Sequence, residues 1–128
     1  MALQFELSPR SLIGLYSDGQ ARPVTWESGP PPRIDGYVVG LTASNPGAAP
    51  RHAGERHPDA DEVLFLISGQ IDVVIEDETG AETVSGVAAG QGIVIPRGAW
   101  HRIVTREPSQ LLHITPGPQG EWRPVARD

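Results

Sequence analysis

The feature that most constrains this chain is a regular alternation of short apolar segments and turn-forming residues from residue 51 onward. Short strands at a spacing of about 8 to 12 residues, with a turn signal in each gap, are typical of β-sandwiches and barrels. The expected strands are Arg51–His57, Glu62–Ile67, Ile71–Glu76, Glu82–Val87, Gly92–Ile95, His101–Thr105 and Gln110–Thr115. The breaks between them fall at 58–61, 68–69, 77–80, 89–90, 96–98 and 107–109. No long apolar stripe with a period of 3.6 is present, which argues against a helix bundle.

The two ends of the chain are less regular. Before residue 50 we expect strands at Arg10–Tyr16, Pro23–Trp26 and Ile34–Thr42. The Pro-rich stretch 29–32 can be neither helix nor central strand, so it predicts an extended connection. We therefore expect a single domain over 1–128, divided into N-terminal strands and a Pro-rich connection (1–50), a core barrel (51–116) and an irregular tail (117–128), with Trp122 packing that tail on the barrel.

Composition excludes several function classes. The chain has no Cys, which rules out disulfides and thiolate ligands, and no Lys, which rules out Schiff-base catalysis. Its net charge is -6 and its ten Arg residues are dispersed, so we expect no nucleic-acid partner. The N-terminal sequence MALQFELSPR does not read as a signal peptide, and no apolar run is long enough to span a membrane. We expect a cytoplasmic protein without a membrane partner.

Four ionisable residues are placed to meet inside such a barrel. Alternate side chains of a strand share a face, so Glu55 and His57 point the same way. Glu62 begins the next expected strand, and His101 begins a later one directly after a Pro-x-Gly turn. Two His with one or two carboxylates form a suitable ligand set for a divalent metal, with iron, manganese, nickel and zinc as candidates.

The spacing of these residues resembles the two motifs of the cupin superfamily. Four residues separate His57 from Glu62, and six separate Glu62 from Gly69, as at the end of the first motif. The segment Gly90–His101 matches the second motif: Gly, five residues, Pro-x-Gly, two residues and His. The stretch Glu55-Arg56-His57-Pro58 also resembles the small single-domain bacterial cupins. The resemblance implies an all-β jelly-roll barrel (a double-stranded β-helix) with metal ligands at His57, Glu62 and His101.

The chain also departs from these motifs. Glu55 stands where the first His is usual, Ala49 where the leading Gly is usual, and Thr105 where the closing Asn is usual. Glu55 could be a fourth metal ligand, an acid placed behind the ligands, or a group that takes over the metal's role. Two carboxylates would cancel the charge of a divalent ion and shift preference toward manganese or iron. Without an ion, we expect repulsion and burial to raise the pKa of Glu55 or Glu62 and so provide a general acid or base.

Each of the remaining candidate residues could have a structural role instead of a functional one. His113 could line the pocket and contact substrate, as a catalytic candidate beside Glu55, or be a satisfied barrel histidine. His52 points away from the ligands and is expected in solvent, Trp100 in core or interface packing, and Phe65 in the core. The run 63–67 is apolar on both faces, so its outer side needs a cover: the N-terminal segment or a second subunit. We therefore expect a homodimer.

Two functions from different classes fit these observations. The first is a divalent-metal-dependent enzyme acting on a small-molecule substrate: an oxygenase (a dioxygenase, for example), an isomerase or a lyase. The second is a non-catalytic cupin that binds or senses a small ligand. Because one fold hosts many reactions, the sequence does not name the substrate.

Overall fold

The computed structural model describes residues 2–48 and 53–124, and within these ranges the chain forms nine strands and no helix. The strands are β1 (Ser11–Tyr16), β2 (Ala21–Thr25), β3 (Gly36–Ser44), β4 (Gly54–Arg56), β5 (Glu62–Glu76), β6 (Glu82–Ala88), β7 (Gly92–Ile95), β8 (His101–Pro116) and β9 (Glu121–Arg123). The described part therefore contains no helix that could cross a membrane. The predicted all-β class is confirmed.

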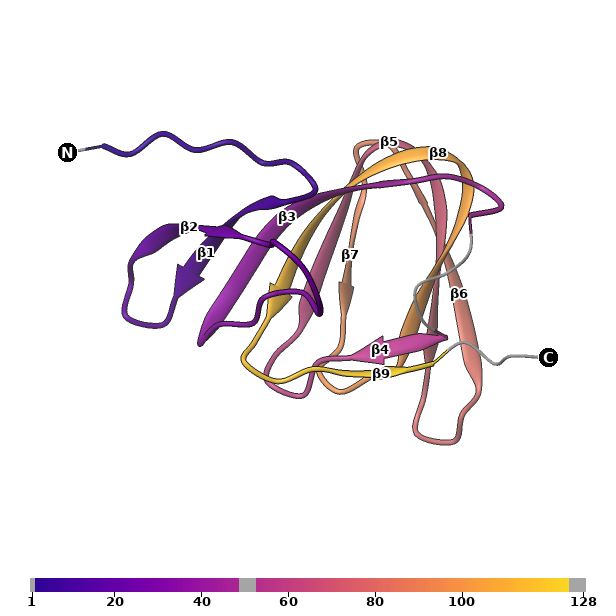
Figure 1. Ribbon diagram of the computed structural model, residues 1–128. Helices are drawn as coiled ribbons and strands as arrows, with labels where there is room; N and C mark the ends of the chain where they lie inside the picture. The colour runs from indigo at the N-terminus through magenta and orange to yellow at the C-terminus, as the bar shows by residue number, and fades with distance from the viewer. Residues whose placement is uncertain (1, 49–52, 125–128) are drawn as a thin grey trace.

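Two long antiparallel strands, β5 and β8, organise the sheet. Their ladder runs from the pair Val63–Ile114 to the pair Ile75–His101. At its first end β5 also pairs with β7, while β8 pairs with β3, which leads on to β1 and β2. At its second end β5 pairs with β6, and β8 pairs with β4, which leads on to β9. Figure 1 shows the result as a curled sheet with β4 and β9 running across its lower part.

Two of the predicted breaks are bends inside strands. The breaks expected at 68–69 and 107–109 lie within β5 and β8, and the ladder shifts register there without ending. Gly69 has a φ of 96°, and its neighbour Gln70 donates its backbone N–H to Ser109 Oγ at 3.1 Å. An irregularity of this kind bends a strand while its pairing continues. The prediction of separate strands was therefore wrong, although the glycine and serine do mark where the chain changes direction.

The predicted irregular tail contains a strand. The backbone of β9 pairs with β4, matching Gly54 with Arg123 and Arg56 with Glu121. The Arg56–Glu121 ion pair, at 2.7 Å, lies beside this ladder. Trp122 does not pack on the barrel as expected, because 63% of its side chain surface is exposed. The expected strand 51–57 is shorter, and Ala49, Arg51 and His52 lie outside the described residues.

The core follows from the alternation of side chains along these strands. One face of the sheet turns inward and buries seven aliphatic residues: Leu64, Leu66, Ile71, Val73, Val87, Ile95 and Leu111. Burial of a Leu, Ile or Val side chain contributes about 1.5 to 3 kcal/mol, so this cluster stabilises the fold. The metal-ligand candidates lie on the same inward face.

The outward face is unusual in the half of the sheet formed by β1, β3, β7 and the Val63–Ile114 end of the β5–β8 ladder, because none of the described residues on it is charged. The register aligns aliphatic side chains in rows across these strands, and we call the following nine residues the outer apolar face: Ile13, Leu15, Val39, Leu41, Val63, Phe65, Val94, Leu112 and Ile114. Phe65, expected in the core, is 39% exposed here, and Val94 is 59% exposed. By contrast, the outward face of the β5–β6–β8 half carries the ion pairs Asp72–Arg106 and Glu82–Arg102.

Candidate metal centre

The four predicted ligands come together at one end of the barrel. Glu55 lies on β4, His57 directly follows it, and Glu62 and His101 are the first residues of β5 and β8. One ligand atom from each residue lies within 4.8 Å of all the others. His57, Glu62 and His101 are buried, while 26% of the Glu55 side chain is exposed.

The bend in β5 is what brings Glu62 to His101. Glu62 adjoins the Val63–Ile114 end of the ladder, whereas His101 pairs with Ile75 at the other end. A straight strand would separate these ends by about 40 Å. The Glu62 Oε1 to His101 Nε2 distance is nevertheless 2.9 Å. The two residues therefore reach the site from opposite walls of the curled sheet.

The spacing of the donor atoms fits a single cation. His57 Nε2 lies 3.2 Å from Glu62 Oε2 and 3.5 Å from Glu55 Oε1. His101 Nε2 lies 3.6 Å from Glu55 Oε1. Ligand atoms at about 2.1 Å from one ion are themselves about 3 to 3.4 Å apart, whether the coordination is octahedral or tetrahedral.

The two imidazole rings have buried nitrogens that other groups leave unsatisfied. Neither Nε2 makes a well-aligned hydrogen bond within the described residues, even though carboxylate oxygens lie near. His101 Nδ1 lies 3.0 Å from the Ala99 carbonyl oxygen, which can only accept, so Nδ1 carries a hydrogen. In the neutral ring Nε2 then holds a lone pair directed at the carboxylates, which is the tautomer that a metal ligand requires.

The charges of the four groups compensate one another without an ion. Burial alone would raise the carboxyl pKa values, but the neighbouring imidazoles outweigh it, lowering the pKa of Glu62 to about 2 and that of Glu55 further. Burial likewise opposes protonation of the rings, yet the carboxylates raise the pKa of His101 to about 10 and also raise the pKa of His57. The expectation of a raised carboxyl pKa was therefore wrong, because it considered the two acids without the two histidines between them.

The other candidates lie outside this cluster. His113 is not among the four donors; its Nδ1 contacts the hydroxyl of Thr115 at 2.9 Å, and that hydroxyl donates to Glu62. Thr105 hydrogen-bonds to Ser44 on β3. The half-buried Trp100 packs against two guanidinium groups, with the Cζ atoms of Arg123 and Arg56 3.9 Å and 4.9 Å from its ring centroid.

Sequence reasoning missed Thr115, the hydrogen-bond partner of Glu62. Thr115 and His113 are two residues apart on one strand, so their shared face could be inferred from the sequence. Their position beside Glu62 depends on the β5–β8 register, which pairs Ile114 with Val63 across fifty residues of chain and which no local pattern reveals.

The comparisons agree with this architecture. The cupin domain family model matches residues 41–115, which is more than half of the chain, and the chain therefore belongs to the cupin family. No curated protein sequence gives a significant match.

Solved structures of oxalate decarboxylase, the first of them from Bacillus subtilis, have a similar fold. The structures include one used to assign EPR parameters of its Mn(II) centres, one on a structural element that modulates proton-coupled electron transfer, and one on its substrate binding mode and a reaction specificity switch. Each aligns with a TM-score of 0.58 and 22% identity over 67% of this chain, but only 23% of the larger one. At this identity the likeness concerns the fold.

Proposed function

We propose that the chain binds one divalent cation through Glu55, His57, Glu62 and His101. The observation that carries this proposal is the convergence of two unsatisfied imidazole Nε2 atoms and two ionised carboxylates at ligand spacing. Two oxygen and two nitrogen donors favour manganese or iron, with zinc and nickel as alternatives. The Mn(II) centres of the structurally similar oxalate decarboxylase are consistent with the first choice.

We further propose that the site serves an enzyme acting on a small molecule, as an oxygenase, an isomerase or a lyase. A bound cation would supply Lewis-acid activation of a substrate oxygen. The protein would supply the surroundings: His57, Glu62 and His101 are buried, while 26% of the Glu55 side chain is exposed. Glu55 is the partly accessible member of the set, so its carboxylate is the group that an incoming small molecule would meet first. His113 lies behind Glu62 and is a weaker candidate for substrate contact.

The burial of the site is also consistent with the alternative function, binding or sensing of a small ligand without catalysis. Three of its four donors are almost fully buried, which suits a site that holds a cation or a small ligand tightly. The two functions differ in what happens to a captured molecule. A ligand that copurifies and is recovered unchanged after long incubation with metal-loaded protein favours binding; conversion to a new compound favours catalysis.

Metal analysis tests the proposed ligand set. Purified protein is supplemented with manganese, iron, zinc or nickel, desalted, and analysed by mass spectrometry for bound metal, with a chelator-treated sample alongside. We expect close to one equivalent in the native chain and a large loss in Glu62→Gln, while Glu121→Gln, on the exposed ion pair of β9, serves as the matched control. Less than a tenth of an equivalent of every metal in the native protein contradicts the proposal.

We also propose that two copies associate through the outer apolar face. An antiparallel sheet with one face on the core normally presents polar residues on its other face. Here that face is neutral and aliphatic in a chain of net charge -6, so the charges that would repel a second copy lie elsewhere. A two-fold contact places the same face of both copies together, and a face without charge brings no like charges together there.

A further inference from the structure

The buried carboxylate of Glu62 has a neighbour outside the four proposed ligands. The hydroxyl of Thr115 on β8 donates a hydrogen bond to Glu62 Oε2 at 2.7 Å, and both residues are buried. In the β5–β8 ladder, Val63 pairs with Ile114. Their chain neighbours Glu62 and Thr115 therefore lie close together on the inward face of adjacent strands. Glu62 Oε1 is left on the side of His101 Nε2, 2.9 Å away.

His113 continues this chain of hydrogen bonds. Its Nδ1 lies 2.9 Å from Thr115 Oγ1. A threonine hydroxyl has one hydrogen, and here it is donated to Glu62, so the same oxygen accepts from His113 and Nδ1 must carry a hydrogen. The direction of the chain is thereby fixed: His113 donates to Thr115, and Thr115 donates to Glu62.

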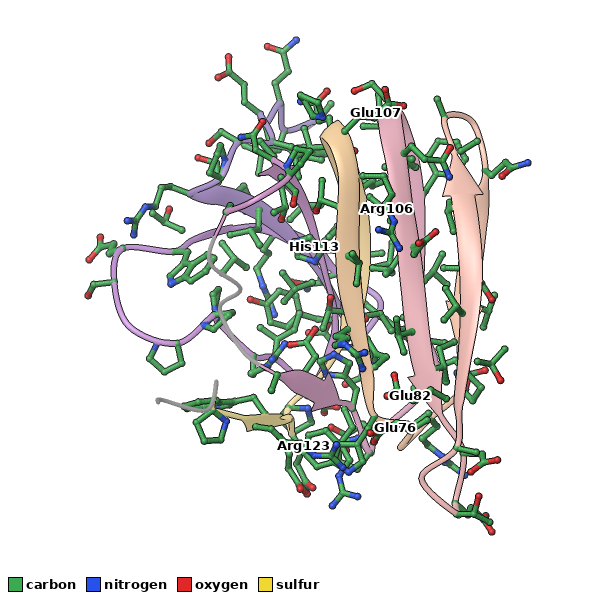
Figure 2. All side chains as sticks on the ribbon, turned by 90° about the vertical axis from the view of Figure 1, so that its right-hand side faces the viewer. Glu76, Glu82, Arg106, Glu107, His113 and Arg123 are labelled. Carbon is green, nitrogen blue, oxygen red and sulfur yellow. The ribbon has the colours of Figure 1, made fainter. Side chains whose placement is uncertain are left out.

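The ring of His113 occupies space that β3 leaves for it. Gly40 lies opposite His113 in the β3–β8 ladder. A Cβ atom on Gly40 would lie 2.6 Å from His113 Nε2 and 2.8 Å from Leu12 Cδ2. Gly40 does not have a positive φ, so its role here is steric: the absence of a side chain leaves room for the His113 ring. Figure 2 shows His113 on β8 beside β3.

We propose that Thr115 and His113 are positioning residues that hold the Glu62 carboxylate in the orientation needed for cation binding. This inference rests on the proposed metal function. A free carboxylate can rotate about its terminal bond, whereas a hydrogen bond to Oε2 from a fixed hydroxyl restricts that rotation. Groups that orient metal ligands typically change metal affinity by about 10- to 100-fold.

The test compares Mn(II) binding by calorimetry and the EPR spectrum of bound Mn(II). Thr115→Val keeps the shape of the side chain but removes the hydroxyl, and we expect about 10- to 100-fold weaker binding and an altered spectrum. Thr115→Ser restores the hydroxyl and should recover affinity to within about threefold, together with the native spectrum. Thr105→Val, on the same strand but bonded to Ser44, is the matched control and should bind like the native chain.

A second pair of variants tests His113. Asn can place an N–H donor near the position of Nδ1, whereas Leu cannot donate. We expect His113→Leu to weaken Mn(II) binding and His113→Asn to recover part of the loss. This pair provides the same test if Thr115→Val does not fold.

The outcomes separate this inference from the proposal beneath it. If the native chain does not bind Mn(II) or any other divalent cation, the metal-binding proposal and the positioning role are both contradicted. If the native chain binds Mn(II) and Thr115→Val matches it in affinity and spectrum, the positioning role is overturned and the metal site stands. Equal losses in Thr115→Val and Thr115→Ser also overturn it, because they would reflect packing and not the hydroxyl.

Discussion

Glu55 differs from the other three ligand candidates in both chemistry and exposure. It occupies the place where the cupin motif usually has histidine, and it is the one member of the set that solvent reaches appreciably. Its carboxylate lies about equally far from both rings, 3.5 Å from His57 Nε2 and 3.6 Å from His101 Nε2. A residue in this position can complete the charge balance of the site and still face an incoming molecule.

The first prediction concerns this carboxylate. Glu55→Gln removes one negative charge but retains an oxygen donor, so we expect Mn(II) to bind at least about tenfold more weakly, as measured by calorimetry. Glu121→Gln, also close to Arg56, should leave the affinity unchanged. Native affinity in Glu55→Gln would show that the carboxylate is not a ligand.

The second prediction concerns the pH dependence of stability in chelator-treated protein. Glu55 and Glu62 have pKa values lowered from 4.5, so their contribution to stability is present above pH 4.5 and is lost as the pH falls toward 2. His101 has its pKa raised from 6.5 to about 10, so its contribution is present below pH 6.5 and is lost as the pH rises toward 10. Thermal unfolding should therefore show the highest Tm between about pH 4.5 and 6.5.

A bound cation should oppose the loss of stability that the metal-free protein shows at alkaline pH. Metal ligation requires neutral imidazole, so protons compete with the ion and affinity rises with pH. We expect the increase in Tm on adding Mn(II) to be larger at pH 8.5 than at pH 6. A metal-free protein that becomes more stable between pH 6.5 and 9 would contradict the charge assignment.

At the scale of elements, the bend in β5 deserves the closest test, because it closes the distance between Glu62 and His101. Gly69→Ala places a side chain at a φ of 96° and against Ser109. We expect a loss of about 1 to 3 kcal/mol in the free energy of unfolding, measured in urea, together with weaker Mn(II) binding.

The matched control for this change lies on β6. A Cβ on Gly86 would meet only ordinary contacts, at 3.6 Å from Asp72 and 3.8 Å from Gln70. Gly86→Ala should therefore leave stability unchanged or raise it by up to about 1 kcal/mol. Equal effects of the two substitutions would mean that the bend tolerates a side chain.

The elements also show what sequence can and cannot predict here. Turn residues located the strands well, because Gly, Pro and Asp act locally on the backbone. The same signals misled at Ser68-Gly69, where a glycine bends a strand that long-range pairing with β8 keeps intact. The strand β9 was missed because its three residues are held by pairing with β4 and carry no strand pattern of their own.

The candidate site was more predictable than its surroundings. Motif spacing indicated His57, Glu62 and His101, and strand alternation placed Glu55 beside His57. The structure brings one ligand atom of each of the four within 4.8 Å of the others. The spacing could not indicate how the four groups shift one another's pKa values or which neighbours support them. The lowered carboxyl pKa values arise from the imidazoles facing them across the barrel, and the support from Thr115 arises from a ladder between distant segments.

At the scale of the whole molecule, the outer apolar face provides the fourth prediction. Light scattering on a size-exclusion column should give the mass of a dimer for the native chain and of a monomer for Phe65→Glu, because the substitution buries an unpaired charge between two neutral faces. Val84→Glu, at a position 60% exposed on β6 and outside this face, is the control and should remain dimeric. A native monomer, or a dimeric Phe65→Glu, would contradict the proposed association.

The long β5–β8 ladder has one more consequence. Side chains alternate between the two sides of a strand, so a slip of one residue in either strand would turn Glu62 or His101 out of the interior. Only molecules in which β5 and β8 have the native register would then form the site. The EPR signal of a bound paramagnetic ion would therefore measure the fraction of molecules that are correctly folded.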